Sequence, residues 1–270
     1  MTLSVIIPSY KDPFLNKTIE DILQNSGLGD DIEIIVVFDG YWGTPLADNR
    51  IRYVHLGRNR GMRGAINAGV SVARGTYLMR TDEHCKYAPG FAKEMLSVIQ
   101  PNWIMTAKRY FLDPYKWEVM DVEPFIYEKL KIRSNEDGSD VKFEGQRWKS
   151  RDRERKDIMV DETFAFQGSF WIMPHQWWKD VIKELQTEGY GPHLQDSHEM
   201  HFKTWQAGGK IIVDKNTWFA HKHWTFNRTH QNGTPENPAE AEKSFKYALD
   251  TWKEYYLKEI NPRQHASYAH

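Results

Sequence analysis

The sequence "GMRGAINAGVSVARGTYLMRTDEHC", residues 61–85, decides the fold. Small and apolar side chains recur at helical spacing over 61–75, which predicts a helix. The next run, "TYLMR" at 76–80, is typical of a strand, and it leads directly into Asp82, Glu83 and His84. The stretch therefore predicts a helix followed by a strand whose carboxyl end carries two carboxylates and an imidazole.

The preceding segments show the same alternation of strand and helix. "LSVIIPS" (3–9), "IEIIVVFDG" (32–40) and "IRYVHL" (51–56) predict strands, and the apolar spacing of "PFLNKTIEDILQNSG" (13–27) predicts a helix. The run at 32–40 is apolar on both faces, as in a central strand of a parallel sheet. We therefore expect an α/β fold of one domain, with a mostly parallel, doubly wound sheet flanked by helices.

Polar residues follow three of these predicted strands. Pro8, Ser9 and Tyr10 end the first strand, Asp39 ends the second, and Asp82 follows the fourth. Sheets of this kind bind ligands just beyond the carboxyl ends of their strands. We expect these residues to converge on one rim.

The second half of the chain has a less regular pattern. Residues 111–161 are rich in charged and turn-forming residues without a sustained period, which predicts long loops that are either solvated and mobile or form a lid or acceptor-binding segment. Further on, the predicted elements are a strand running into a helix near Pro174 (164–185), a helix at 195–209, short strands at 210–214 and 217–220, and a C-terminal helix at 238–257.

Composition limits the function classes. The 36 Lys and Arg nearly balance the 37 Asp and Glu among 270 residues, so no global charge attracts nucleic acid or membrane. The single Cys85 excludes an intrachain disulfide and a Cys-rich zinc module. No apolar run reaches the roughly 20 residues of a membrane span, and "MTLSVIIPSY" lacks the basic region of a signal peptide. A cytoplasmic location is expected.

The order of these motifs resembles nucleotide-sugar glycosyltransferases of the GT-A fold, close to family 2. In place of that superfamily's DxD motif, Asp82-Glu83-His84 resembles the DxH motif of polypeptide N-acetylgalactosaminyltransferases. "EMHFKTWQAGG" (199–209) is similar to a helix of those enzymes, and "WFAHKHW" (218–224) falls where they place a metal-binding His. The resemblance implies metal-dependent transfer of a sugar from a nucleotide diphosphate sugar to an acceptor hydroxyl.

The resemblance implies a metal site made by Asp82, His84 and one of His221 or His223. Mixed carboxylate and imidazole ligands suit Mn²⁺, with Mg²⁺ as the alternative that would favour more oxygen ligands. His221 is preferred by the resemblance, and the other histidine is then a packed or acceptor-side residue. The competing interpretation of the DxH sequence is a polar turn at a strand end.

The donor site implied by the resemblance uses the first strand ends. Asp39 would accept from the nucleobase or ribose, which favours UDP, unless it is a turn or capping residue. Tyr10 would stack on the base above Pro8 and Ser9, or else be a core aromatic. Arg63 would reach a phosphate.

A loop that closes over the donor is expected just after His221 and His223. Arg228 precedes the Gly-, Pro- and Asn-rich segment "THQNGTPENP", and residues 225–237 resemble a flexible lid that would exclude water. Arg228 is therefore a candidate donor-binding residue.

The acceptor step leaves two interpretations open. In inverting GT-A enzymes a carboxylate at the start of the helix after the central loops deprotonates the acceptor hydroxyl, and Asp196 is the candidate base at the matching place. The structural alternative is a capping box formed by Asp196 and Glu199. The DxH enzymes retain configuration and use no such base, so the stereochemistry stays open. The acceptor is a glycan, a protein, a lipid carrier or a modified nucleic acid.

The expected division of the single domain is a nucleotide-sugar-binding half at 1–110, a loop-rich insertion at 111–163, an acceptor and metal-binding half at 164–237, and a C-terminal helix and tail at 238–270.

Two other function classes remain as alternatives to a glycosyltransferase. A nucleotidyltransferase would share the α/β half, but the sequence has no G-x-x-x-x-G-K-[ST] loop. A non-catalytic carbohydrate- or nucleotide-binding module would use some of the eleven Trp residues for stacking.

Overall fold

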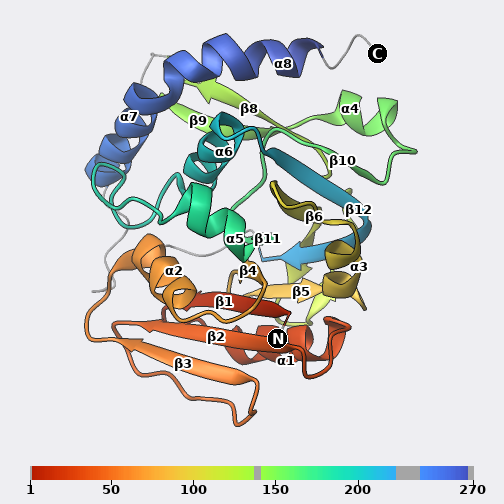
Figure 1. The fold of residues 1–270 in the computed structure, drawn as a ribbon, viewed down its shortest axis with the longest axis vertical. Helices are drawn as coiled ribbons and strands as arrows, with labels where there is room; N and C mark the ends of the chain where they lie inside the picture. Colours follow the sequence, from red (N-terminus) through yellow and green to blue (C-terminus); the bar gives the residue numbers. More distant parts are fainter. Residues whose placement is uncertain (1, 137–140, 223–237, 267–270) are drawn as a thin grey trace.

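The computed structural model describes residues 2–136, 141–222 and 238–266. Its main sheet has the strand order β10-β12-β6-β11-β4-β1-β2-β3, with β5 paired to β12 and β7 to β6 (Figure 1). The strands are β1 Leu3–Ser9, β2 Ile32–Asp39, β3 Ile51–Leu56, β4 Tyr77–Thr81, β5 Cys85–Tyr87, β6 Trp103–Asp113, β7 Glu118–Val119, β8 Glu128–Arg133, β9 Lys142–Arg147, β10 Val160–Glu162, β11 Phe170–Pro174 and β12 Lys210–His221. The helices are α1 Leu15–Asn25, α2 Gly61–Ser71, α3 Phe91–Val98, α4 Lys149–Glu154, α5 His175–Trp177, α6 Asp196–Gln206, α7 Pro238–Tyr255 and α8 Asn261–Ala266, with single π-helical turns at Trp178–Ile182 and Tyr256–Ile260.

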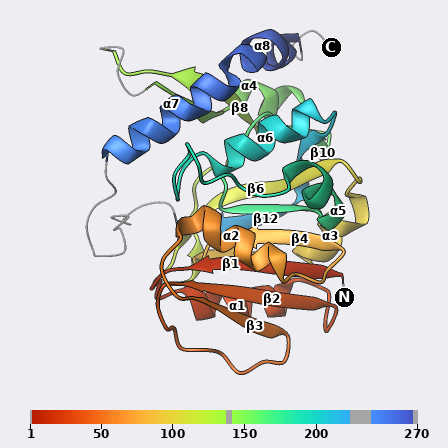
Figure 2. The same cartoon turned by 60° about the vertical axis from the view of Figure 1, so that its left-hand side comes forward.

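The amino-terminal half is the expected parallel sheet covered on both faces. Strands β4, β1, β2 and β3 run parallel, and α1 and α2 lie on opposite faces (Figure 2). Alternation along β1 explains this arrangement, because Val5 packs in a buried cluster with Ile19 of α1, whereas Ile6 packs in another with Ile66 of α2. Gly69 lets α2 approach closely, since a Cβ there would lie 2.5 Å from Ile6. The fold class predicted from the sequence is therefore confirmed.

The middle of the chain corrects the expectation of long loops. Residues 128–133 and 142–147 pair as the antiparallel hairpin β8–β9, and 149–154 form α4. Leu130 and Phe143 of the hairpin are almost fully buried in the main core. The sequence does not predict these strands, because charged side chains such as Lys131 and Glu144 alternate with the buried residues. The insertion is thus a packed layer.

The segment after α6 also differs from its prediction. Residues 210–221 form one strand, β12, parallel to β6, where two short strands were expected. The register shifts between Asp214 and Trp218, so the turn-like sequence there is an irregularity within a continuous strand. This strand carries the chain from the end of α6 back to the sheet rim.

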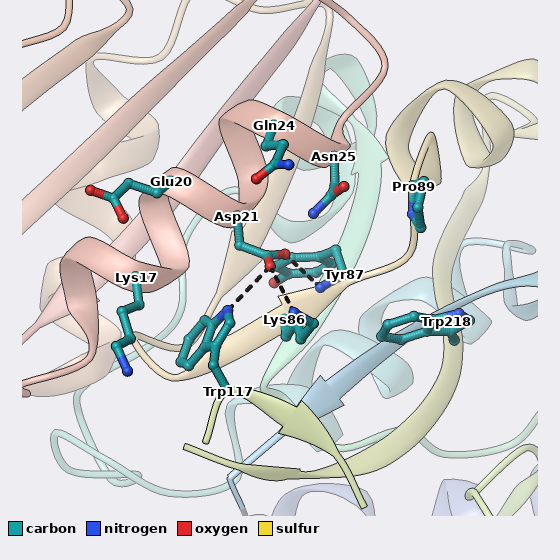
Figure 3. A pocket seen from close by; sticks show the side chains of 10 residues that line it. All are labelled: Lys17, Glu20, Asp21, Gln24, Asn25, Lys86, Tyr87, Pro89, Trp117 and Trp218. Atoms are coloured by element: carbon teal, nitrogen blue, oxygen red, sulfur yellow. Dashed lines mark hydrogen bonds and ion pairs between the residues drawn. The ribbon is translucent and has the colours of Figure 1, made fainter. Parts of the chain in front are cut away.

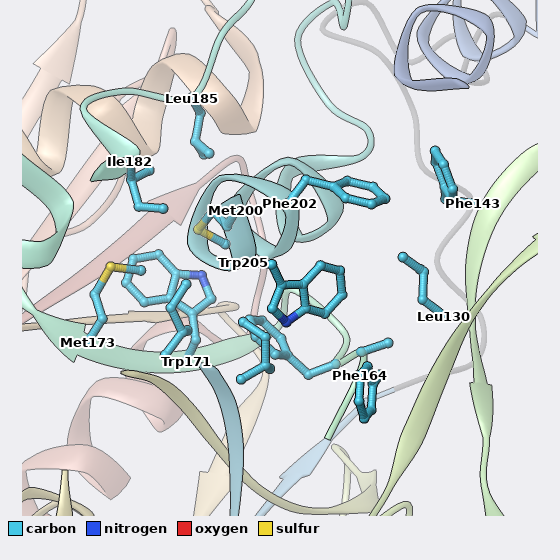
Figure 4. Packing of buried hydrophobic residues seen from close by; sticks show 14 of the residues in the cluster. Leu130, Phe143, Phe164, Trp171, Met173, Ile182, Leu185, Met200, Phe202 and Trp205 are labelled. Carbon is cyan, nitrogen blue, oxygen red and sulfur yellow. The ribbon is translucent and has the colours of Figure 1, made fainter. Parts of the chain in front are cut away.

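Helix α6 lies in the same main core as the hairpin. Its Phe202 and Trp205 pack among aromatic and aliphatic side chains from β11 and the hairpin, including Trp171 and Phe143 (Figure 4). Phe202 also stacks on Trp252 of α7, with ring centroids 5.0 Å apart. The predicted helix at 195–209 is confirmed, and the C-terminal helix continues beyond the predicted 257 to residue 266. Within the described ranges, no helix is both long and apolar enough to cross a bilayer.

Candidate active site

Three side chains from distant parts of the chain meet at the sheet rim. Asp82 directly follows β4, and its backbone N–H donates to the Ser169 carbonyl at 3.0 Å. His84 lies in the turn before β5, and His221 ends β12. The antiparallel register of β12 and β5 pairs His221 with Cys85, which places its ring beside His84. The metal ligands expected from the resemblance are thus neighbours in the fold.

The spacing of this metal cluster, Asp82, His84 and His221, fits one divalent cation. His221 Nε2 lies 3.1 Å from Asp82 Oδ2 and 3.1 Å from His84 Nε2, and the three ligand atoms all lie within 4.8 Å of one another. Adjacent ligand atoms of an octahedral ion with bonds of about 2.1 Å lie about 3 Å apart. The donor set of one carboxylate and two imidazoles therefore suits Mn²⁺ better than Mg²⁺, which favours more oxygen ligands.

Asp12 supports the cluster from behind. Its Oδ2 lies 2.9 Å from Nδ1 of His84, and its Oδ1 accepts from the Phe14 N–H at 2.7 Å. A carboxylate on one ring nitrogen fixes the imidazole and leaves the other nitrogen for a metal. Sequence reasoning missed Asp12, although its position just beyond the first strand was the available signal. It is only 8% exposed.

The protonation states match those of metal ligands. Burial opposes ionisation of Asp82, but the Arg80 guanidinium and His221 hold the pKa of this carboxyl well below its usual range. Burial lowers the pKa of His221 to about 3, which outweighs the opposing effect of Asp82. At neutral pH the cluster therefore has an ionised carboxylate and a neutral His221 ring.

Arg80 is the cation that faces Asp82. Its Nη2 donates to Asp82 Oδ1 at 2.6 Å, and its Nη1 donates to the Gly168 carbonyl. The side chain is 2% exposed, whereas Asp82 is 26% exposed toward the neighbouring cavities. Sequence reasoning did not single out Arg80, because inside a predicted strand an arginine carries no signal of its partner.

Arg63 is not the phosphate ligand that was expected. Its side chain is fully buried and forms a short ion pair with Glu199. It also donates to the Leu194 carbonyl at 2.9 and 2.6 Å and to the Gln186 carbonyl at 2.9 Å. The guanidinium therefore ties α2 to α6 and to the segment before it, and the predicted contact is wrong because these partners occupy it.

A cavity of about 160 Å³ gathers most of the predicted donor residues. Pro8, Ser9, Tyr10 and Asp39 line it together with Asp82. The hydroxyl of Ser9 hydrogen-bonds to that of Tyr41, and the Tyr10 ring meets the Tyr41 ring edge-on with centroids 5.8 Å apart. The expected convergence of the strand ends is therefore confirmed for these residues.

Asp39 also has the turn role that was its alternative. Its Oδ1 accepts from the Arg60 N–H at 2.6 Å, and burial raises the pKa of the carboxyl. Gly40 is required next to it, because its φ is +78° and a Cβ would lie 2.3 Å from the Asn59 nitrogen. Asp39 thus both shapes this turn and faces the cavity.

Glu83 also lines this cavity. Its Oε1 accepts from the Tyr10 N–H at 3.1 Å. Burial and the nearby Asp12 raise the pKa of Glu83 to about 8. A carboxyl of this kind is largely protonated at neutral pH and can donate a hydrogen bond.

A second, larger cavity of about 440 Å³ adjoins the first and shares Met62, Arg80, Asp82 and His193 with it. Asp196 lies in its wall at the first residue of α6 and is 7% exposed. Its Oδ2 has no hydrogen-bond partner among the residues that the structure describes, and a Cβ on Gly168 would lie 2.7 Å from this oxygen. Gly168 thus makes room for the carboxylate.

The capping-box interpretation of Asp196 is wrong. Gln195 occupies the N-cap position in a left-handed conformation, and no side chain caps this helix within the described part of the chain. The Glu199 carboxylate is bound instead by Arg63 and by Lys203, whose Nζ lies 2.6 Å from Oε1.

Three other expectations, the metal ligand His223, the donor-binding Arg228 and the lid at 225–237, lie outside the described residues.

The comparisons with known proteins agree with this geometry. A sequence model of glycosyl transferase family 2 matches residues 4–152, more than half of the chain. The uncharacterized glycosyltransferase EpsJ of Bacillus subtilis (strain 168) is 38% identical over 88 residues, which cover 28% of this chain and 24% of that protein.

Solved structures share the architecture. A crystal structure of GalNAc-T7 with UDP, GalNAc and Mn²⁺ superimposes with a TM-score of 0.73 at 15% identity, over 95% of this chain and 50% of that one. A crystal structure of S. aureus TarS 1-349 gives a TM-score of 0.55 at 11% identity, over 96% of this chain and 75% of that one. The chain thus spans half of the GalNAc-T7 chain, and its match with EpsJ about a quarter of that relative. From the family match, the chain belongs to glycosyl transferase family 2, and the architecture that it shares with these structures is the GT-A fold.

Proposed function

We propose that this glycosyltransferase is metal-dependent and moves a sugar from a UDP-sugar to an acceptor hydroxyl. The observation that carries the proposal is the position of the metal cluster, since Asp82 lines both adjoining cavities. One cavity would hold the nucleotide and the other the acceptor, with the sugar between them. This assigns the donor mainly to residues 1–110 and the acceptor mainly to residues 111–237.

Asp82, His84 and His221 would hold the cation, with Mn²⁺ expected and Mg²⁺ as the alternative. A divalent cation supplies positive charge that stabilises the departing diphosphate. Asp12 orients His84, and Arg80 fixes Asp82 from the protein side. Support from outside the chain comes from GalNAc-T7, whose crystal structure contains UDP and Mn²⁺.

The smaller cavity suits the nucleotide. Tyr10 offers an aromatic face, and Asp39 and Glu83 offer hydrogen-bonding groups of different protonation. The uracil imide donates a hydrogen bond that an aspartate can accept, and we assign this contact to Asp39. The base and ribose would then lie near the ends of β1 and β2.

In the larger cavity Asp196 would act as the general base. The acceptor oxygen forms a bond to the anomeric carbon while the bond from that carbon to the diphosphate oxygen breaks, and Asp196 takes the hydroxyl proton. Its Oδ2, which is buried and has no hydrogen-bond partner in the described part of the chain, is available for this proton. The product would have inverted configuration.

A screen of nucleotide sugars tests the proposal. Release of the nucleoside diphosphate is measured with UDP-, GDP- and dTDP-sugars in the presence of Mn²⁺, and again in chelator. We expect turnover with a UDP-sugar that the chelator abolishes. Release of pyrophosphate would instead identify a nucleotidyltransferase, and full turnover in chelator would reject the metal site.

The role of Asp196 has its own test. Asp196→Asn should lower transfer by about 10²–10⁴-fold with donor binding nearly unchanged, because the amide cannot accept a proton. Asp250→Asn on the exposed side of α7 is the matched control. A product with retained configuration, formed by the variant at nearly full rate, would show that the leaving phosphate takes the proton instead. An inverted product formed at nearly full rate would show that another residue is the base.

A further inference from the structure

A separate cavity of about 520 Å³ lies beside α1, β5 and the turn before β7 (Figure 3). Among the described residues, it shares no lining residue with the two cavities at the metal cluster. Its volume lies within the roughly 300–1,000 Å³ range of small-molecule sites. The proposed transfer reaction assigns it no role.

Asp21 organises the walls of this cavity. It is 6% exposed, and it accepts from the Tyr87 N–H at 2.7 Å and from Trp117 Nε1 at 3.3 Å. Lys86 Nζ lies 3.7 Å away. Burying a carboxylate is costly unless it is paired and hydrogen-bonded. This network holds an indole and an ammonium group beside an open space.

Trp117 is held there by a strained turn. Asp113 Oδ1 accepts from the Tyr115 and Lys116 N–H groups at 3.0 and 3.1 Å, which forms the turn. Trp117 then adopts a φ of +59°, a conformation that bulky residues rarely adopt. Its ring stacks on Phe14 with centroids 6.5 Å apart. Strain of this kind clusters at binding sites.

A second indole lies across the cavity. Figure 3 shows Trp117 and Trp218 on opposite sides of Lys86. Trp218 comes from β12, and the Tyr110 ring meets it edge-on with centroids 5.9 Å apart. Two aromatic side chains therefore flank a polar floor.

The charges of the cavity select a neutral ligand. The lining cations Lys17 and Lys86 balance the anions Glu20 and Asp21. Polyanions need an excess of positive charge, which is missing from this described lining. Aromatic faces bind the apolar face of a sugar ring, and the amides, carboxylates and ammonium groups together can both donate to and accept from its hydroxyls.

We propose that this cavity is a second saccharide site, which binds a short neutral oligosaccharide apart from the transfer reaction. Trp117 and Trp218 would contact the faces of the sugar rings, and Lys86, Asn25 and Glu20 would bind the hydroxyls. The site requires neither the metal nor the nucleotide. It would retain a glycan acceptor or product on the enzyme.

The test uses the full chain in chelator, without any donor. Lactose, maltotriose, cellotriose and chitotriose are titrated and followed by saturation-transfer NMR and tryptophan fluorescence. We expect at least one of them to bind with a Kd below about 10 mM. Trp117→Ala and Trp218→Ala should each weaken that binding by about tenfold or more.

Matched controls keep this test separate from the transfer reaction. Trp42→Ala removes an indole that is 83% exposed elsewhere, and His84→Ala disables the metal cluster, so both should leave saccharide binding unchanged. Thermal unfolding checks that each variant is folded, and Lys86→Met serves if Trp117→Ala is not. The proposal is overturned if none of the four saccharides binds, if Trp218→Ala binds as well as wild type, or if tri-galacturonate is preferred.

Discussion

The metal cluster and the Arg63 cluster differ although both lie beside the carboxyl ends of the sheet strands. In the metal cluster, the side chains of Asp82 and His84 are 26% and 17% exposed, and Asp82 lines both adjoining cavities. In the Arg63 cluster, Arg63 and Glu199 are 0% and 1% exposed, and all three nitrogens of the guanidinium donate to protein oxygens. The two clusters therefore differ in exposure, because only in the metal cluster can a ligand reach the charged side chains.

Removing a member of the metal cluster is expected to have the largest effect. His84→Ala and Asp82→Asn should abolish transfer, a loss of more than about 10³-fold, because the charge of the departing diphosphate is then unbalanced. The midpoint of thermal unfolding should change little, since both side chains are partly exposed to solvent. His265→Ala on the exposed face of α8 serves as the control. Normal turnover by either variant would contradict the contrast between the clusters.

Removing Arg63 should act on stability instead. Arg63→Met leaves the Glu199 carboxylate buried beside one remaining cation, which should cost about 3–5 kcal/mol in the free energy of unfolding. Urea denaturation measures this cost. Arg133→Met breaks an ion pair whose side chains are 63% and 38% exposed, and it should cost less than about 1 kcal/mol. A stable Arg63→Met variant that fails to bind UDP would restore the predicted phosphate contact.

Asp12 tests the comparison of the two clusters further, because it is buried but contacts His84 of the metal cluster. Asp12→Asn can still accept from Phe14 N–H but holds the His84 ring less firmly. The affinity for Mn²⁺ should fall by about 10–100-fold while the fold persists. Calorimetric titration with Mn²⁺ measures the change, and Asp48→Asn, in a loop ion pair with Arg50, is the control. Equal affinities would show that the His84 ring needs no such support.

The smallest expected effect concerns pH. His201 is fully buried, and burial lowers its pKa well below 6.5, so the unfolded chain binds this proton more readily than the folded one. Stability is therefore complete above about pH 6.5 and falls below it, by up to about 1.4 kcal/mol per pH unit. His201→Phe should flatten the dependence measured by urea denaturation between pH 6.5 and 5. Parallel curves for the two proteins would contradict the assignment.

The predictable parts of the molecule are those set by local pattern. Strand β2 was recognised because its residues are buried on both faces, and α6 because its apolar spacing ends at a Gly pair. The hairpin β8–β9 was missed because its buried residues alternate with charges, which resembles a solvated loop. Asp12 and Arg63 could not be assigned because their partners, His84 and Glu199, lie 72 and 136 residues away in the sequence.

Because the register of β12 is irregular, the number of residues in this strand determines where His221 lies. Residues 215–217 lie between two stretches that pair with β6 in different registers, and His221 reaches Asp82 only at the end of the second stretch. Loss of one residue from 218–220 would turn every following side chain, including that of His221, to the opposite face of the sheet. Homologues that keep this centre should therefore vary there by substitution, while insertions and deletions are selected against.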